Sequence, residues 1–281
     1  KEVKSYLTSM IGYVFIFFIL LLEGIYFTAY NLQNAYPLFG TTLSAVTFIF
    51  LILVPVLTMK TIAEERKQKT DQLLLTAPVS VSEIVLGKFL AVATVYAIPV
   101  LIICLYPMIM GKYGTVSYAM AYTAVLGFAL LGFAQIAVGV FWSSVTENPV
   151  IAAVVTFIVL FVCYMITGIG SLIPDSSMAS LACYMLLVLL AAVWIYHMIR
   201  NLWIAAVIGI AGEAALAITY VVKSTLFEGS IQKFLSVFDI TSHFDNFTNG
   251  ILDLQGVVYF LSVIIIFLVL TVQTITKRRW N

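Results

Sequence analysis

The chain has 281 residues, of which 63% are hydrophobic and only 10% are charged. Soluble domains carry about 25% charged residues, so this composition excludes an ordinary soluble globular protein and predicts an integral membrane protein. The formal net charge of +1 favours no charged partner, and we expect no nucleic-acid partner. Cys104, Cys163 and Cys183 lie inside apolar runs and predict neither a disulfide framework nor a metal site.

Apolar runs of membrane-spanning length recur along the whole chain. A helix needs about 20 apolar residues to cross the hydrocarbon core, and eight runs meet this length, which predicts an all-α polytopic helix bundle. The runs cover residues 10–30, 41–59, 84–110, 117–142, 149–172, 180–198, 202–222 and 256–276. The first is too long for a signal peptide and carries Glu23, so we expect a retained membrane helix.

The basic residues predict the orientation of these spans. If the N-terminus is inside and the spans alternate, only Lys112, Lys223 and Lys233 of the 14 Lys and Arg residues fall in outer segments. Lys and Arg favour the cytoplasmic side, so both termini are predicted to be cytoplasmic. His197 and His243 then lie on opposite sides, which argues against a histidine-based metal site or catalytic dyad.

Local patterns mark where helices begin and where they touch. Ser80 and Glu83 form a capping-box pattern before the third span, and Asn148-Pro149 is a typical start for the fifth. Small residues four positions apart, such as Gly139 and Ser143, are candidate helix contacts. Alanine pairs at the same spacing arise often by chance.

A charged island interrupts the apolar sequence after the second span. Seven charged residues lie between Lys60 and Asp71, and a segment this polar must protrude into water. Three adjacent leucines follow at positions 73–75, and exposed leucines need a partner. The island therefore predicts a docking surface; the alternative is a solvated loop of mixed charge.

The long outer segment 223–255 is amphipathic. Ile231, Phe234, Leu235 and Phe238 recur at helical spacing, which predicts a helix on the outer membrane surface. Three roles remain open for it: a lid packed on the outer end of the bundle, an outer gate, or a docking site for an extracytoplasmic accessory protein. The candidate residues for the last two roles are Phe234, Phe238, His243, Phe244 and Phe247.

Polar residues within the spans are candidates for a transport path. Glu23 and Glu213 are the acidic ones, and Gln135 lies in the fourth span. Carboxylates in lipid are costly and usually face the bundle interior or water. The two carboxylates predict either a polar, proton-sensitive lining or a structural role, in which they are hydrogen-bonded or Glu23 simply lies near the outer interface, and we favour the structural role. For Gln135 we favour a contact between helices over a contact with substrate.

The chain lacks the pattern needed to bind ATP through a P-loop. That pattern, G-x-x-x-x-G-K-[ST], cradles phosphates with backbone amides. Its nearest approach is Gly87-Lys88, where Ser82 replaces the first glycine and Phe89 replaces the hydroxyl residue. We predict no catalytic residue, no metal site and no cofactor in this chain.

The charged island and the end of the chain resemble ABC-2 type transporter permeases. The first motif comprises Ala63 to Arg66, Thr70, Leu73 to Ser80 and Glu83 to Lys88. The second comprises His243 to Phe247, Gly250-Ile251, Asp253-Leu254, Val257 to Ser262 and Lys277 to Trp280, and it is similar to the gliding-motility and copper-enzyme-maturation branch.

The resemblance implies that a separate cytoplasmic ABC ATPase binds ATP and Mg²⁺, and that two permease chains form the membrane path. Residues 1–9 would be an elbow helix, and 60–83 would contain the main coupling element. A second contact would lie at Ser143–Asn148. Simple members have six spans, so the hairpin at 180–222 resembles an insertion. The implied ATPase contacts are Glu64, Glu65, Arg66, Thr70, Leu73, Leu74, Thr76, Pro78, Val79, Thr146, Glu147 and Asn148.

The favoured function is the permease subunit of an ATP-driven exporter, forming one transmembrane domain over residues 1–281 in a bacterial plasma membrane. One alternative is a non-transporting membrane scaffold or sensor that keeps the ATPase interface. Another is an intramembrane enzyme, which would need convergent catalytic groups at membrane depth. The sequence offers only the isolated Glu23 and Glu213 for that chemistry.

Overall fold

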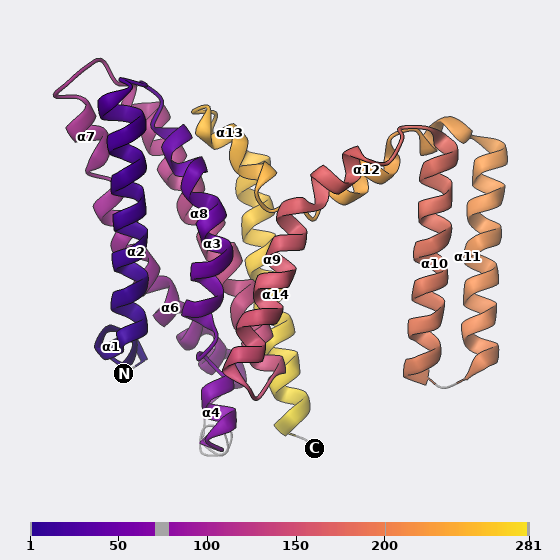
Figure 1. Cartoon of the computed structure of the whole chain (residues 1–281). Coiled ribbons are helices and arrows are strands. Elements are labelled where there is room, and N and C mark those ends of the chain that lie inside the picture. The colour runs from indigo at the N-terminus through magenta and orange to yellow at the C-terminus, as the bar shows by residue number, and fades with distance from the viewer. Residues whose placement is uncertain (1, 71–78, 200, 280–281) are drawn as a thin grey trace. The chain divides into compact units, whose positions relative to one another are not determined.

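The computed structural model describes residues 2–70, 79–199 and 201–279, and no strand occurs within these ranges (Figure 1). The helices form two compact units. Unit 1 comprises Lys1–Val162 and Ile240–Asn281, and unit 2 comprises Cys163–Asp239. The division falls within helix α9 (Pro149–Ser171).

Seven helices in the described ranges are long and apolar enough to cross a membrane. Helix α11 (Leu202–Val222) passes the same test only together with the residues that follow a 116° bend. The seven contain α2 (Met10–Phe27) with the π-helical turn η1 (Thr28–Gln33), α3 (Phe39–Thr58), α6 (Val81–Ile103), α8 (Tyr118–Val145), α9, α10 (Ser177–Ile199) and α14 (Leu254–Arg279). Seven of the eight predicted spans correspond to these helices, and the run at 202–222 lies on α11, which does not qualify by itself. The structure therefore confirms an all-α polytopic membrane protein.

Helix α8 is the central helix of unit 1 and packs against α3, α6 and α14. Two glycines on α8 let α3 and α6 come close to it. A Cβ atom at Gly139 would overlap the side chain of Thr58 on α3, and one at Gly132 would overlap the ring of Tyr96 on α6. The Tyr96 hydroxyl donates to the carbonyl of Phe128 at 2.7 Å, so α6 and α8 are also joined by a buried hydrogen bond.

The start signals read from the sequence are confirmed. Ser80 accepts from the Glu83 amide and Glu83 accepts from the Ser80 amide, which completes the capping box of α6. Asn148 accepts from the Val150 amide at 2.9 Å at the start of α9.

Helix α14 has a cap of its own at Asp253. A hydrogen bond from the side-chain amide of Asn246 lowers the pKa of Asp253, and the carboxylate of Asp253 also caps the first turn of α14.

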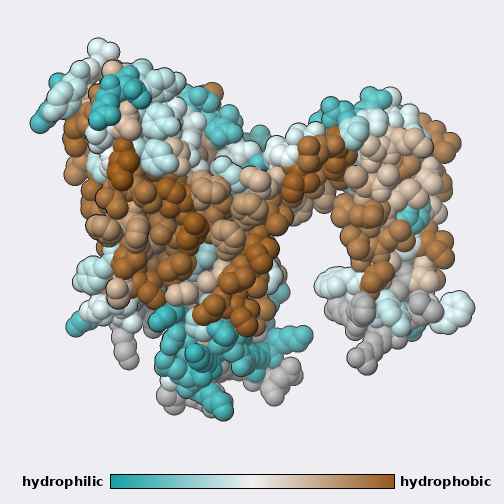
Figure 2. Space-filling view, in the orientation of Figure 1, coloured by the Kyte–Doolittle hydropathy of each residue, from teal (hydrophilic) through white to brown (hydrophobic). Residues whose placement is uncertain are grey.

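Polar elements gather at one end of unit 1. The short helices α1 (Glu2–Thr8) and α4 (Ala63–Lys67) lie there, as does the C-terminal end of α14 (Figure 1). Helices α7 (Tyr106–Met110) and α13 (Asp245–Thr248) lie at the opposite end. Figure 2 shows hydrophilic residues around the end that carries α4, beyond a hydrophobic band.

Unit 2 is a helical hairpin with short connecting helices. Helices α10 and α11 pack against each other, and both contact η2 (Ser224–Phe227). Helix α12 (Ser230–Ser236) packs on α10 and η2. The predicted hairpin at 180–222 corresponds to α10 and α11, and its origin as an insertion stays a prediction.

We expect Gly139→Ala to lower the stability of unit 1, because the added methyl group would collide with Thr58 on α3. Overpacking of this kind costs about 1–3 kcal/mol. The matched control is Gly87→Ala, since a Cβ atom at Gly87 on α6 has no neighbour within 4 Å. Thermal unfolding in detergent should show a lower midpoint for Gly139→Ala alone, and equal midpoints would contradict the close approach of α3 and α8.

Candidate coupling site at the root of α4

The root of α4 is a turn at residues 59–62, which separates α3 from α4 and is held by a serine from another helix. Helix α4 has no side-chain cap of its own. The Ser143 hydroxyl on α8 accepts from the amides of Ile62 and Ala63, each at 3.1 Å, and donates to the carbonyl of Met59 at 3.1 Å. One donor and two acceptor positions are all that a hydroxyl has, so Ser143 caps α4 with its full hydrogen-bonding capacity.

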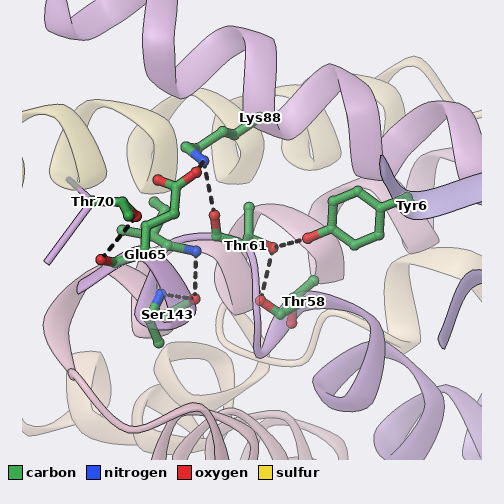
Figure 3. A network of polar contacts seen from close by, with 9 residues as sticks. Tyr6, Thr58, Thr61, Glu65, Thr70, Lys88 and Ser143 are labelled. Atoms are coloured by element: carbon green, nitrogen blue, oxygen red, sulfur yellow. Dashed lines mark hydrogen bonds and ion pairs between the residues drawn. The ribbon is translucent and has the colours of Figure 1, made fainter. Parts of the chain in front are cut away.

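A buried ion pair fixes α4 to α6 (Figure 3). The Lys88 ammonium lies 2.5 Å from a Glu65 carboxylate oxygen and donates to the Thr61 carbonyl at 3.0 Å. The Lys88 side chain is 5% exposed, whereas that of Glu65 is 25% exposed. A lysine this deeply buried requires such a partner, since desolvating an isolated ammonium is costly.

The N-terminal helix α1 contacts the same root. The Tyr6 hydroxyl lies 2.9 Å from the Thr61 hydroxyl, which itself donates to the Thr58 carbonyl at 2.8 Å. Because the Thr61 hydroxyl has one proton, Tyr6 is the donor of the first bond. The predicted elbow at residues 1–9 thus contains a helix that is hydrogen-bonded to the base of the charged island.

Helix α4 presents one face to unit 1 and the other outward. Ala63 and Arg66 are buried, while Lys67 and Gln68 are exposed and Glu64 is half-buried. The outward residues are the ones available to a docking partner. Sequence reasoning placed Glu65 among the ATPase contacts, but its carboxylate is engaged with Lys88.

The helix ends in a Schellman motif that has lysine in the usual glycine position. The Thr70 amide donates to the Glu65 carbonyl at 2.9 Å, and the Lys69 amide donates to the Arg66 carbonyl at 3.1 Å. Lys69 has a φ of 56°, in the left-handed region. Glycine is the usual residue there because it has no Cβ penalty.

The second predicted contact, Ser143 to Asn148, ends in a loop that lies beside the end of α14. Glu147 forms an ion pair with Arg278, and Asn148 caps α9 while Thr146 donates to the Asn148 carbonyl. The sequence did not indicate that α14 would reach this loop. Of the remaining predicted contacts, Val79 is 42% exposed, whereas Leu73, Leu74, Thr76 and Pro78 lie outside the described residues.

The polar residues of the spans do not form one cluster of hydrogen-bonded groups. Glu23 is fully buried and Gln135 is 2% exposed, both in unit 1. Glu213 lines a groove between α10 and α11 in unit 2. Within the described residues, neither carboxyl group has a hydrogen-bond partner, nor has the side-chain oxygen of Gln135. The structural role that we favoured from the sequence requires hydrogen bonds, and the two carboxyl groups form none within the described part of the chain.

The predicted outer gate residues belong to different units. Phe244 and Phe247 are buried in unit 1 and lie close to α8, and His243 stacks on Tyr259 with ring centroids 3.7 Å apart. Phe234 and Phe238, which pack edge to face in unit 2, are partly exposed. A gating or docking role for these five residues stays a prediction.

Sequence reasoning missed the residues that hold the root of α4, above all Lys88 and the specific role of Ser143. A usable signal existed for Lys88, which is the only Lys or Arg inside the predicted spans. An intramembrane lysine demands an acidic or carbonyl partner. No group of three potential metal ligands occurs among the described residues.

Replacing one member of the buried ion pair should lower the free energy of unfolding more than replacing both members. Glu65→Met leaves a buried ammonium without its carboxylate and should lower the free energy of unfolding by about 3 kcal/mol. Lys88→Met leaves a partly exposed carboxylate and should lower it by about 1 kcal/mol. The double variant should recover most of the loss. Thermal unfolding of the four proteins measures this cycle, and additive losses would show that the pair is not coupled.

Ser143→Ala should make α4 open more often, because two buried amides lose their acceptor. Each unsatisfied amide costs about 1–3 kcal/mol of stability. The matched control is Ser144→Ala, since the equally buried Ser144 hydroxyl donates only within its own helix, to the Phe141 carbonyl. Hydrogen exchange at residues 62–67 should accelerate in the first variant and stay unchanged in the second. Equal exchange in both would mean that Ser143 is not the cap.

A comparison with protein-family models matches residues 23–272 to the model described as ABC-2 family transporter protein. No curated protein matches the chain. The match covers most of the chain and agrees with its apolar, polytopic helical architecture. The chain therefore belongs to the ABC-2 transporter family, as a multi-pass membrane permease.

Proposed function

We propose that this permease is driven by a separate cytoplasmic ABC ATPase that docks on the outward face of α4 and on the loop at 146–148. One observation carries the proposal: α4 is a charged helix at the polar end of unit 1, yet its root is bonded to α1, α6 and α8. A solvated loop of mixed charge would need no such buried attachment. The family match supports the ATPase partner, since ABC-2 permeases are membrane components of ABC transporters.

The attachment gives the partner a mechanical path into the bundle. A displacement of α4 pulls on Lys88 in α6 and on Ser143 in α8, because both side chains bind α4 or its root directly. Helix α8 in turn packs closely against α3 and α14. Close-packed helices transmit displacement since their interfaces do not deform continuously.

The conformation of Lys69 supports docking at this end of α4. A lysine in the left-handed region costs about 1 kcal/mol relative to glycine. Strained backbone of this kind is often kept where a side chain has a function. We infer that Lys69, which is exposed, contacts an acidic group of the ATPase.

The proposal extends to the finer functional assignments. We infer that the transporter is an exporter with two permease chains, located in a bacterial plasma membrane. The motif from His243 to Trp280 supports a relationship to the gliding-motility and copper-enzyme-maturation branch. The exposed Phe234 and Phe238 offer an apolar contact for an extracytoplasmic accessory protein.

Charge reversal on the outward face of α4 should disrupt the complex. We expect Glu64→Lys with Lys67→Glu to reduce co-purification with ABC ATPases from the same genome by at least tenfold. Each buried charge contact at an interface is worth about 1.4 kcal/mol or more. Permease-stimulated ATP hydrolysis in nanodiscs should fall in parallel.

Two further variants control for folding and for nonspecific charge. Lys112→Glu changes an exposed residue of the loop after α7 and should leave the complex intact. Lys69→Gly should stabilise the isolated permease while weakening the complex, because it relieves strain and removes the ammonium. If the reversed α4 still bound and stimulated the ATPase, docking on α4 would be wrong.

A further inference from the structure

Glu23 is a fully buried carboxyl group that forms no hydrogen bond. It lies on α2, one turn before that helix ends at Phe27, and the residue is 0% exposed. Within the described residues, neither of its carboxyl oxygens has a hydrogen-bond partner. Buried polar groups almost always have a partner, so this carboxyl group requires an explanation that packing does not supply.

The described helices around Glu23 supply no cation that could balance a negative charge. Helices α2, α3, α7 and α8 contain no Lys, Arg or His. Lys88 is the only basic residue of α6, and it is paired with Glu65 at the polar end. Helix α1 contributes Lys4 but touches α2 at Gly12, near the opposite end of that helix. Because an isolated buried carboxylate is strongly disfavoured, the carboxyl group keeps its proton in this conformation.

The titratable groups that face Glu23 are two tyrosines. Tyr96 on α6 and Tyr106 on α7 each interact electrostatically with its carboxyl group. The Tyr96 hydroxyl is committed to the carbonyl of Phe128 at 2.7 Å. Tyr106 is partly exposed, and its hydroxyl lies 3.8 Å from the position that a Cβ atom at Gly24 would occupy. The neighbours of Glu23 are therefore uncharged phenols, and one of them reaches the surface.

The other elements packed against α2 add no charged group. Helix α3 has no titratable side chain. The turn η1 carries only Tyr30, whose ring stacks on that of Tyr26 on α2 with centroids 6.0 Å apart. Tyr13, the remaining titratable residue of α2, lies about 15 Å from Glu23 along the helix axis. A proton is thus the positive charge that can accompany this carboxyl group in the described part of the chain.

The outer half of α2 is loosely packed and continues into a distorted turn. Only 28% of the apolar window of α2 is buried, compared with 72% for α8. The π-helical turn η1 holds about one residue more per turn than an α-helix, and such turns frequently mark functional sites. Asn31 in η1 accepts from the Thr42 hydroxyl on α3 at 2.5 Å, so η1 is fixed to α3. A return of η1 to α-helical geometry would therefore rotate α2 and turn Glu23 away from the interior.

We propose that Glu23 is a proton-binding site coupled to movement of the outer half of α2. In the buried position the carboxyl group keeps its proton. When α2 rotates toward the predicted outer surface, the O–H bond breaks, the proton passes to water, and the carboxylate remains at the water boundary until it is protonated again. The proposal is independent of ATPase docking, because neither the proton nor the rotation requires a nucleotide.

Hydrogen exchange of the full chain in nanodiscs tests the coupling, after correction for the intrinsic exchange rate at each pH. Raising the pH removes the proton and favours the outer position, so residues 20–33 should open more often at alkaline pH. Linkage to one proton gives a slope that approaches about tenfold per pH unit. Glu23→Gln has no proton to lose and should abolish the slope, whereas the matched control Glu213→Gln, which changes a carboxyl group in unit 2, should keep it. A slope that survives Glu23→Gln, or wild-type exchange without a slope, would overturn the proposal.

Infrared spectroscopy observes the proton directly and needs no substitution at Glu23. In Glu213→Gln, the C=O stretch of a protonated carboxyl group without a hydrogen bond should be present at neutral pH, where exposed carboxyl groups are ionised. It should disappear reversibly on alkaline titration, over the range in which residues 20–33 open. Absence of the band at neutral pH would mean that Glu23 is already ionised. A band that persists at every pH would mean that the acid is purely structural, and either result would show the proposal to be wrong.

Discussion

The buried ion pair between Lys88 and Glu65 is the constraint on which the polar end of this permease depends. A lysine near the boundary of the hydrocarbon region can remain charged only beside an acceptor. Its nearest carboxylate belongs to α4, so the pair holds the charged helix against α6. Ser143 adds a second attachment from α8. A helix that composition alone would place loosely in water is thereby fixed to the bundle.

Helix α8 connects this polar end to the rest of unit 1. Gly139 lets it approach α3 beside the root of α4, and Gly132 lets it approach α6. Farther along, the buried Phe244 and Phe247 pack close to the same helix. Because packed interiors have little free volume, the proposed coupling would carry a displacement at one end of α8 to the aromatic side chains at the other.

The C-terminal end of α14 adds a third element to the surface formed by α4 and the loop after α8. Arg278 pairs with Glu147, and Lys277 precedes it at the same end of α14. Basic residues gather at this end, which the distribution of Lys and Arg along the sequence predicts to be cytoplasmic.

The sequence by itself located the seven membrane-spanning helices of the described residues, the capping box at Ser80 and the family, because hydropathy, capping and motifs are properties of neighbouring residues. It also located the charged island. Only the tertiary structure decided which island residues face inward, since Lys88 pairs with a residue 23 positions away and Ser143 with one 81 positions away. Glu65 is the clearest case: the motif suggested a contact with an ATPase, which stays a prediction, whereas the ion pair of its carboxylate with Lys88 could be seen only in the structure. Such pairings depend on how close α6 and α8 come to α4, and helix packing sets that distance, whereas local patterns do not.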